Sequence, residues 1–161
     1  MNTNAFIIPL FLFFTINLCS CSTYCVNSTP GQGDITSMDS IYISGIKIYS
    51  DDAGNLEHSL VKNCCFSLSK RDYRVASFIQ SSVKADDFNY HAYISIHSKN
   101  YGDILNPQVS TAFFFDIHKK GSNIPVAVIR LTSRRCNIHD VRHQVELAET
   151  LAEKMDSMVD R

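Results

Sequence analysis

The sequence predicts an α+β domain: a single sheet of about five strands, largely an antiparallel meander, with two helices on one face. Residues 90–98 alternate apolar and polar side chains, the pattern of a strand with one buried and one solvated face. Residues 55–70 and the segment after Asn137 instead repeat apolar residues at steps of three and four, the period of an amphipathic helix. The resulting order, strand, helix, four strands, helix, is typical of one sheet with helices on one side.

The first predicted strand carries four isoleucines in two different phases. Ile41 and Ile43 share one strand parity, and Ile46 and Ile48 share the other. Gly45 stands where the phase changes. A β-bulge at this position would return all four isoleucines to the core face.

The helix over 55–70 follows a turn and capping segment, residues 51–55. At 100° per residue its apolar side chains form one stripe, with Cys65 on the margin. The stripe consists of Leu56, Leu60, Val61, Cys64 and Leu68. This face is expected to pack against the sheet.

Four further strands are expected before the last helix. They cover residues 73–80, 90–98, 109–118 and 124–132, and residues 119–123 between the last two have the composition of a hairpin turn.

The last helix is expected to begin with Asn137 as its N-cap and to turn a wide apolar face toward the sheet. That face consists of Val141, Val145, Ala148, Ala152, Met155 and Val159, widened by Leu147, Leu151 and Met158.

The N-terminal segment has the pattern of a signal peptide. Residues 5–18 are mostly apolar and uncharged, but they are too few to span a bilayer, which takes about 20 apolar residues. They end in Leu18-Cys19-Ser20-Cys21, with small residues just before a cysteine. This motif resembles the lipobox of bacterial lipoproteins. The resemblance covers four residues and implies cleavage before Cys21 and attachment of acyl chains to its thiol.

Ser22 after this cysteine is similar to the pattern of lipoproteins sent to the outer membrane, which implies attachment to its inner leaflet, facing the periplasm. One feature departs from the usual pattern, because residues 1–6 contain no Lys or Arg. An ordinary secretory signal and an uncleaved membrane anchor therefore remain alternatives.

The expected organisation is a signal peptide over 1–20, a flexible stalk over 21–38 and one α+β domain over 39–161. The stalk follows from its Ser, Thr, Gly and Pro content. The element order of the domain loosely resembles TolB-type amino-terminal domains and curli-secretion-type lipoproteins. That likeness carries no diagnostic motif and implies no functional residue.

Four cysteines remain once Cys19 is cleaved off and Cys21 is lipidated: Cys25, Cys64, Cys65 and Cys136. In an oxidising compartment they allow three pairings, and spacing does not choose among them. Helical phase favours a Cys65–Cys136 disulfide, because Cys64 falls in the middle of the apolar stripe. A Cys64–Cys136 disulfide is almost equally compatible.

The sequence offers little enzymatic chemistry. It has a formal net charge of -1, with no polybasic run and no glycine-rich phosphate loop, so neither a nucleic-acid partner nor a cofactor is expected. His139 and His143 are four residues apart, but the glutamate that a metalloprotease needs is missing, so no metal site is expected. No catalytic residue is identified.

The most informative surface candidates are aromatic. Tyr93 and Phe114 fall on the solvated parity of their strands, near Tyr101 in the adjoining loop, and exposed aromatic residues favour protein contacts. Coverage of these rings by a loop or by the stalk segment is an equally good alternative. The favoured hypothesis is a lipid-anchored periplasmic module that binds an unidentified envelope protein and acts by contact rather than turnover. The alternatives are a small secreted or envelope enzyme with a thiol or hydrolytic site, and a soluble secreted recognition domain stabilised by disulfides.

Overall fold

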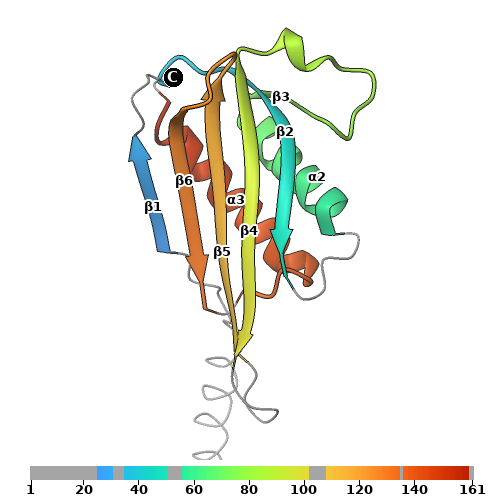
Figure 1. The fold of residues 1–161 in the computed structure, drawn as a ribbon, viewed down its shortest axis with the longest axis vertical. Helices are drawn as coiled ribbons and strands as arrows, with labels where there is room; N and C mark the ends of the chain where they lie inside the picture. Colours follow the sequence, from blue (N-terminus) through green and yellow to red (C-terminus); the bar gives the residue numbers. More distant parts are fainter. Residues whose placement is uncertain (1–24, 31–34, 51–55, 102–107, 135, 160–161) are drawn as a thin grey trace, which may run out of the picture.

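The computed structural model describes residues 25–30, 35–50, 56–101, 108–134 and 136–159. Figure 1 shows one sheet with both long helices on the same face. The strands are β1 (Cys25–Pro30), β2 (Ser40–Tyr49), β3 (Arg74–Ser77), β4 (Tyr90–Tyr101), β5 (Gln108–Lys119) and β6 (Pro125–Ser133). The helices are α2 (Leu56–Ser69), the short 3₁₀ helix η2 (Ala85–Asp87) and α3 (Val141–Asp156).

The predicted α+β class and element order are confirmed, and the sheet is mixed rather than largely a meander. Its strand order is β1-β6-β5-β4-β2-β3. β4, β5 and β6 form the expected antiparallel meander. β2 instead runs parallel to both β3 and β4, because α2 carries the chain back across the sheet before β3 begins.

The β-bulge predicted in the first strand is present. The register between β2 and β4 shifts between Ile43 and Gly45. Ile41 and Ile43 lie in the core below the helices, and Ile46 and Ile48 pack against the same core from beyond the bulge.

The two long helices lie side by side and run parallel. Near their start, Ser59 Oγ donates to Gln144 Oε1 at 2.8 Å, while Gln144 Nε2 donates to the Ile138 carbonyl at 2.8 Å. Near their end, Arg71 forms ion pairs with Glu153 and Asp156, both at 3.3 Å. The stripe predicted for α2 is buried throughout: Leu56, Leu60, Val61, Cys64 and Leu68.

The predicted phase and cap of α3 are wrong at its N-terminal end. Asp140 is the N-cap and accepts a hydrogen bond from the Arg142 backbone N–H at 2.9 Å, whereas Asn137 Oδ1 accepts from His139. The buried face begins at Gln144, and Val141 and Val145 are exposed. The spacing of apolar residues could not predict this, because the core position is occupied by a polar residue, Gln144. Its amide group is buried between the helices with its hydrogen bonds made.

The segment predicted as a flexible stalk contains ordered structure. Within 21–38, β1 pairs antiparallel with β6 and becomes an outer strand of the sheet, while Ile35 and Met38 are buried. Strand pairing through backbone hydrogen bonds does not require apolar side chains, so composition gave no sign of it. Among the described residues, no helix is long and apolar enough to cross a membrane.

Candidate interaction surface

The face of the sheet opposite the helices carries a row of rings and cations that come from four adjacent strands. We name this row the open-face array. It consists of Lys47 and Tyr49 from β2, His97 from β4, Phe114 from β5 and Arg130 from β6.

Neighbouring members of the array contact one another from strand to strand. The Tyr49 ring stacks on the His97 ring, with centroids 4.4 Å apart and planes 10° from parallel. His97 then meets Phe114 edge to face at 5.8 Å. The Arg130 guanidinium lies 5.3 Å from the Phe114 centroid, and Lys47 Nζ lies 5.0 Å from the Tyr49 centroid. The array is therefore a continuous stack across the sheet.

Strand register places these side chains together. Tyr49 pairs with His97 and Phe114 pairs with Arg130, so each pair shares a face of the sheet. The bulge at Gly45 contributes too, because it turns Ile46 and Ile48 inward and leaves Lys47 and Tyr49 outward. Aromatic and cation–π contacts of this kind each contribute about 0.5–1 kcal/mol at exposed sites, so the array is partly preorganised.

The same face continues toward the other end of β4. The rings of Tyr93 and His118 meet edge to face at 5.4 Å, and Tyr93 is 48% exposed. Asp116 stands opposite Tyr93, and partial burial raises the pKa of its carboxyl although His118 opposes the shift. His91 Nδ1 and Ser44 Oγ form a hydrogen bond at 2.9 Å.

A second, small core closes this face near β3. Tyr42, Ala76 and Phe88 form its buried cluster, and Val83 and Ala85 of the segment before β4 pack against it. This segment covers only one part of the sheet, and the array lies outside the cluster.

The charge on this face is mainly positive. On β2, β4, β5 and β6 it carries Lys47, Lys99 and Arg130, against the single carboxylate of Asp116. A surface that combines rings with cations suits a partner with acidic and apolar groups.

The structure places two of the three predicted surface residues on this face. Tyr93 is exposed and Phe114 is half-buried within the array. The side chain of Tyr101 lies outside the described residues. Sequence reasoning missed Tyr49 and Arg130, although the predicted bulge already implied an outward Tyr49.

The predicted disulfides involving the helix are wrong. Cys64 and Cys65 are both free thiols, so neither forms a bridge to Cys136. The geometry explains this, because Cys65 interacts with Ser77 on β3 at one side of the sheet. Cys136 follows β6 instead, where Thr111 Oγ1 of β5 donates to its carbonyl at 2.7 Å. The side chain of Cys25 lies outside the described residues.

Neither thiol of α2 has the environment of an activated nucleophile. Complete burial strongly raises the pKa of Cys64. Burial also raises the pKa of Cys65, and a hydrogen bond with Ser77 offsets this only in part. Thiol catalysis needs the opposite shift, because the thiolate is the reactive form.

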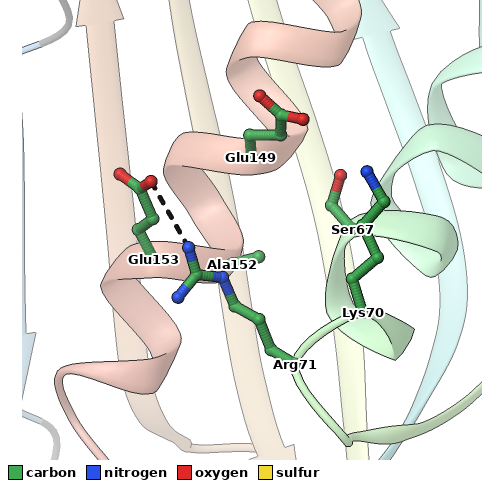
Figure 2. Close-up of a pocket in the computed structure, with 6 residues that line it drawn as sticks. All are labelled: Ser67, Lys70, Arg71, Glu149, Ala152 and Glu153. Atoms are coloured by element: carbon green, nitrogen blue, oxygen red, sulfur yellow. Dashed lines mark hydrogen bonds and ion pairs between the residues drawn. The ribbon is translucent and has the colours of Figure 1, made fainter.

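A cavity of about 460 Å³ lies on the helix side, between the C-terminal halves of α2 and α3 (Figure 2). It is lined by Ser67, Lys70, Arg71, Glu149, Ala152 and Glu153. Arg71 is engaged with Glu153, and Lys70 Nζ lies 4.5 Å from the Phe66 ring centroid. None of the lining residues is a histidine that could activate Ser67. The cavity is therefore interpreted as a polar groove between the two helices. No group of three or more metal-binding side chains occurs in the described part of the chain.

Comparison with known proteins adds a likeness of fold. No family model and no curated protein matches the sequence. Among solved structures, the PelC dodecamer from Paraburkholderia phytofirmans matches with a TM-score of 0.63 at 12% identity, covering 86% of this chain and 100% of PelC. A variant of the same PelC dodecamer matches with a TM-score of 0.60 at 12% identity over the same shares of both chains. The chain therefore has the fold seen in PelC.

A weaker likeness is to the lipoprotein GNA1162 from Neisseria meningitidis, with a TM-score of 0.45 at 15% identity, covering 73% of this chain and 98% of that one.

Proposed function

We propose that this chain is a lipid-anchored lipoprotein of the bacterial envelope, facing the periplasm, that works as a binding or assembly module. The open-face array carries the proposal of a contact function, because it leaves stacked rings and cations on a sheet face that the long helices do not cover. The lipobox-like motif ending in Cys21 supports the anchor, with the inner leaflet of the outer membrane as the expected location.

The likeness to PelC adds a form of assembly to this proposal. PelC is described as a dodecamer, so the first partner to consider is a second copy of this chain, alongside a different envelope protein. Contact rather than turnover is the proposed mode of action. Binding would bury the array and exclude water from rings that are already in place, which lowers the entropic cost of association.

Anchoring is tested by the intact mass of the mature protein recovered from a membrane fraction. The expected mass starts at Cys21 and includes a diacylglyceryl group and one further acyl chain. A Cys21→Ser variant should be found outside the membrane fraction. Retention of that variant with the leader still attached would favour an uncleaved anchor instead.

The contact surface is tested by partner recovery and by native mass, compared between two kinds of variant. Phe114→Ala and Tyr49→Ala remove rings from the array and should weaken the complex by about ten-fold each, as expected for loss of about 1.4 kcal/mol. Phe66→Ala is the matched control, because Phe66 is a ring of α2 that is 61% exposed on the helix side. Equal recovery from array and control variants would contradict the proposed surface.

A further inference from the structure

The position of β1 sets how this domain meets the membrane. Cys21 lies only four residues before Cys25, where β1 begins. Even a fully extended chain covers about 14 Å over that separation. If acyl chains are attached to Cys21, the start of β1 is therefore held close to the bilayer, with no room for a long spacer.

The start of β1 identifies one end of the sheet. Cys25 pairs with Thr132 near the end of β6, and α3 begins shortly after β6 ends. β2 also finishes at this end, because Tyr49 pairs with His97 in the second half of β4. We name this the β1-start end, and Figure 1 shows it as the lower end of the sheet.

The β1-start end presents apolar side chains together with cations. Val141 is 62% exposed and Val145 is 37% exposed in the first turns of α3. Tyr49, at the end of β2, is 45% exposed. Among the described residues, the exposed cations at this end include Lys99, Arg134 and Arg142. In the same described part, Glu57 is an exposed acid, while Asp140 is engaged with Arg142 at 3.2 Å.

Exposed apolar and cationic residues occur at both ends of the sheet, so surface composition alone does not identify the end that faces the membrane. Ile124, beside the β5–β6 turn, is 63% exposed and follows Lys119 and Lys120. β6 separates this turn from the β1-start end by nine residues, or about 30 Å. A tether of about 14 Å keeps the β1-start end near the bilayer and places no such limit on the far end, so the tether favours the β1-start end as the end that meets the membrane.

We infer that the β1-start end rests on the bilayer surface, with Val141 and Val145 at the boundary between headgroups and acyl chains and the cations beside lipid phosphates. This inference rests on the proposed lipid attachment. Amphipathic contacts of this kind add to acyl anchors and fix the orientation of an anchored domain. The sheet face that carries the open-face array then stands roughly perpendicular to the membrane, and the array itself runs parallel to the membrane surface, because it crosses strands that rise from that surface.

The chain contains no tryptophan, so single substitutions provide unique fluorescent probes. Val141→Trp and Ile124→Trp are a matched pair, since both replace apolar residues of nearly equal exposure at opposite ends. Each mature protein is placed in vesicles of phosphatidylethanolamine and phosphatidylglycerol with brominated acyl chains. The tryptophan at position 141 should lose most of its emission and shift to the blue, while the tryptophan at 124 should keep its emission.

Equal quenching of the two probes, or stronger quenching at position 124, would overturn the orientation. A probe at 141 that is blue-shifted but not quenched would also overturn it and would indicate a protein contact, such as a second copy. The mass of the same samples separates the two proposals, because a lipidated protein with the wrong quenching order refutes only the orientation. If Cys21 proves unmodified, the proposed lipid anchor fails. The orientation is then tested separately by replacing Cys21 with a hexahistidine tag bound to nickel-chelating lipid, and the tryptophan at 141 must still be quenched more strongly than the tryptophan at 124.

Discussion

The bulge in β2 depends on the number of residues rather than on glycine, and this can be tested at one position. Gly45 does not have a positive φ, and a Cβ added there would meet Tyr93 Cδ1 at 3.7 Å, an ordinary contact distance. Gly45→Ala should therefore keep the bulge. Deletion of Gly45 removes the extra residue and moves every following side chain of β2 to the other face.

The expected cost of the deletion follows from what changes face. Ile46 and Ile48 would leave the core side, and because they are only half-buried their loss is about 2–3 kcal/mol together. Lys47 would turn toward the core, where an unpaired ammonium costs several kcal/mol more or forces the strand to detach. The deletion should lower the free energy of unfolding by about 4 kcal/mol or more. Gly45→Ala should change it by less than about 1 kcal/mol in either direction.

Urea denaturation followed by circular dichroism measures both variants against the parent domain. The deletion should also abolish the stacking of Tyr49 on His97, which the chemical shifts of the histidine ring protons report. Equal stabilities of the deletion and substitution variants would refute the claim that the bulge sets the facing of β2. A Gly45→Ala cost as large as that of the deletion would instead show that glycine itself is required.

Three further outcomes are expected. Gln144→Met should cost about 2 kcal/mol of unfolding free energy, and a double-mutant cycle with Ser59→Ala should give a coupling of about 1 kcal/mol, so strictly additive losses would contradict the interhelical hydrogen bond. Because burial raises the folded pKa of Asp116 above its unfolded value, stability should fall as pH rises from about 4 through the folded pKa, and Asp116→Asn should remove this slope in urea titrations at a series of pH values. Cys64 and Cys65 should resist alkylation in the native protein and gain one adduct each in denaturant, located by the masses of their peptides, whereas rapid native modification of Cys65 would reopen a thiol function.

Sequence patterns predicted those parts of the fold in which side-chain periodicity reports burial directly. β4 alternates so regularly that its buried side, Ala92, Ile94 and Ile96, could be identified without coordinates. The stripe of α2 and the phase change at Gly45 were informative for the same reason. Strand order was not available in this way, because a parallel partner for β2 depends on where α2 returns the chain.

The buried face of α3 was predicted incorrectly at its N-terminal end because one buried residue there is polar. Gln144 is 1% exposed, yet a hydrophobic pattern excludes glutamine from a core. Its amide is satisfied by groups far away in sequence, Ser59 and the Ile138 carbonyl, which no local pattern contains. Val141 and Val145 are exposed as a result, and they form part of the surface that we propose to rest on the membrane.

The sequence predicted only part of the open-face array, because the contacts within the array depend on how neighbouring strands are paired. Strand parity alone could place Phe114 outward, but its contact with His97 requires knowing that β4 and β5 pair in the observed register. Arg130 joins only through the pairing of β5 with β6. The same limit applies to β1. The composition of residues 21–38 predicted a spacer, whereas backbone pairing with β6 makes part of this segment a strand of the sheet. If Cys21 carries the proposed acyl chains, a strand that begins four residues later couples the direction of the sheet to the bilayer, whereas a longer spacer would let the domain tumble away from the lipid.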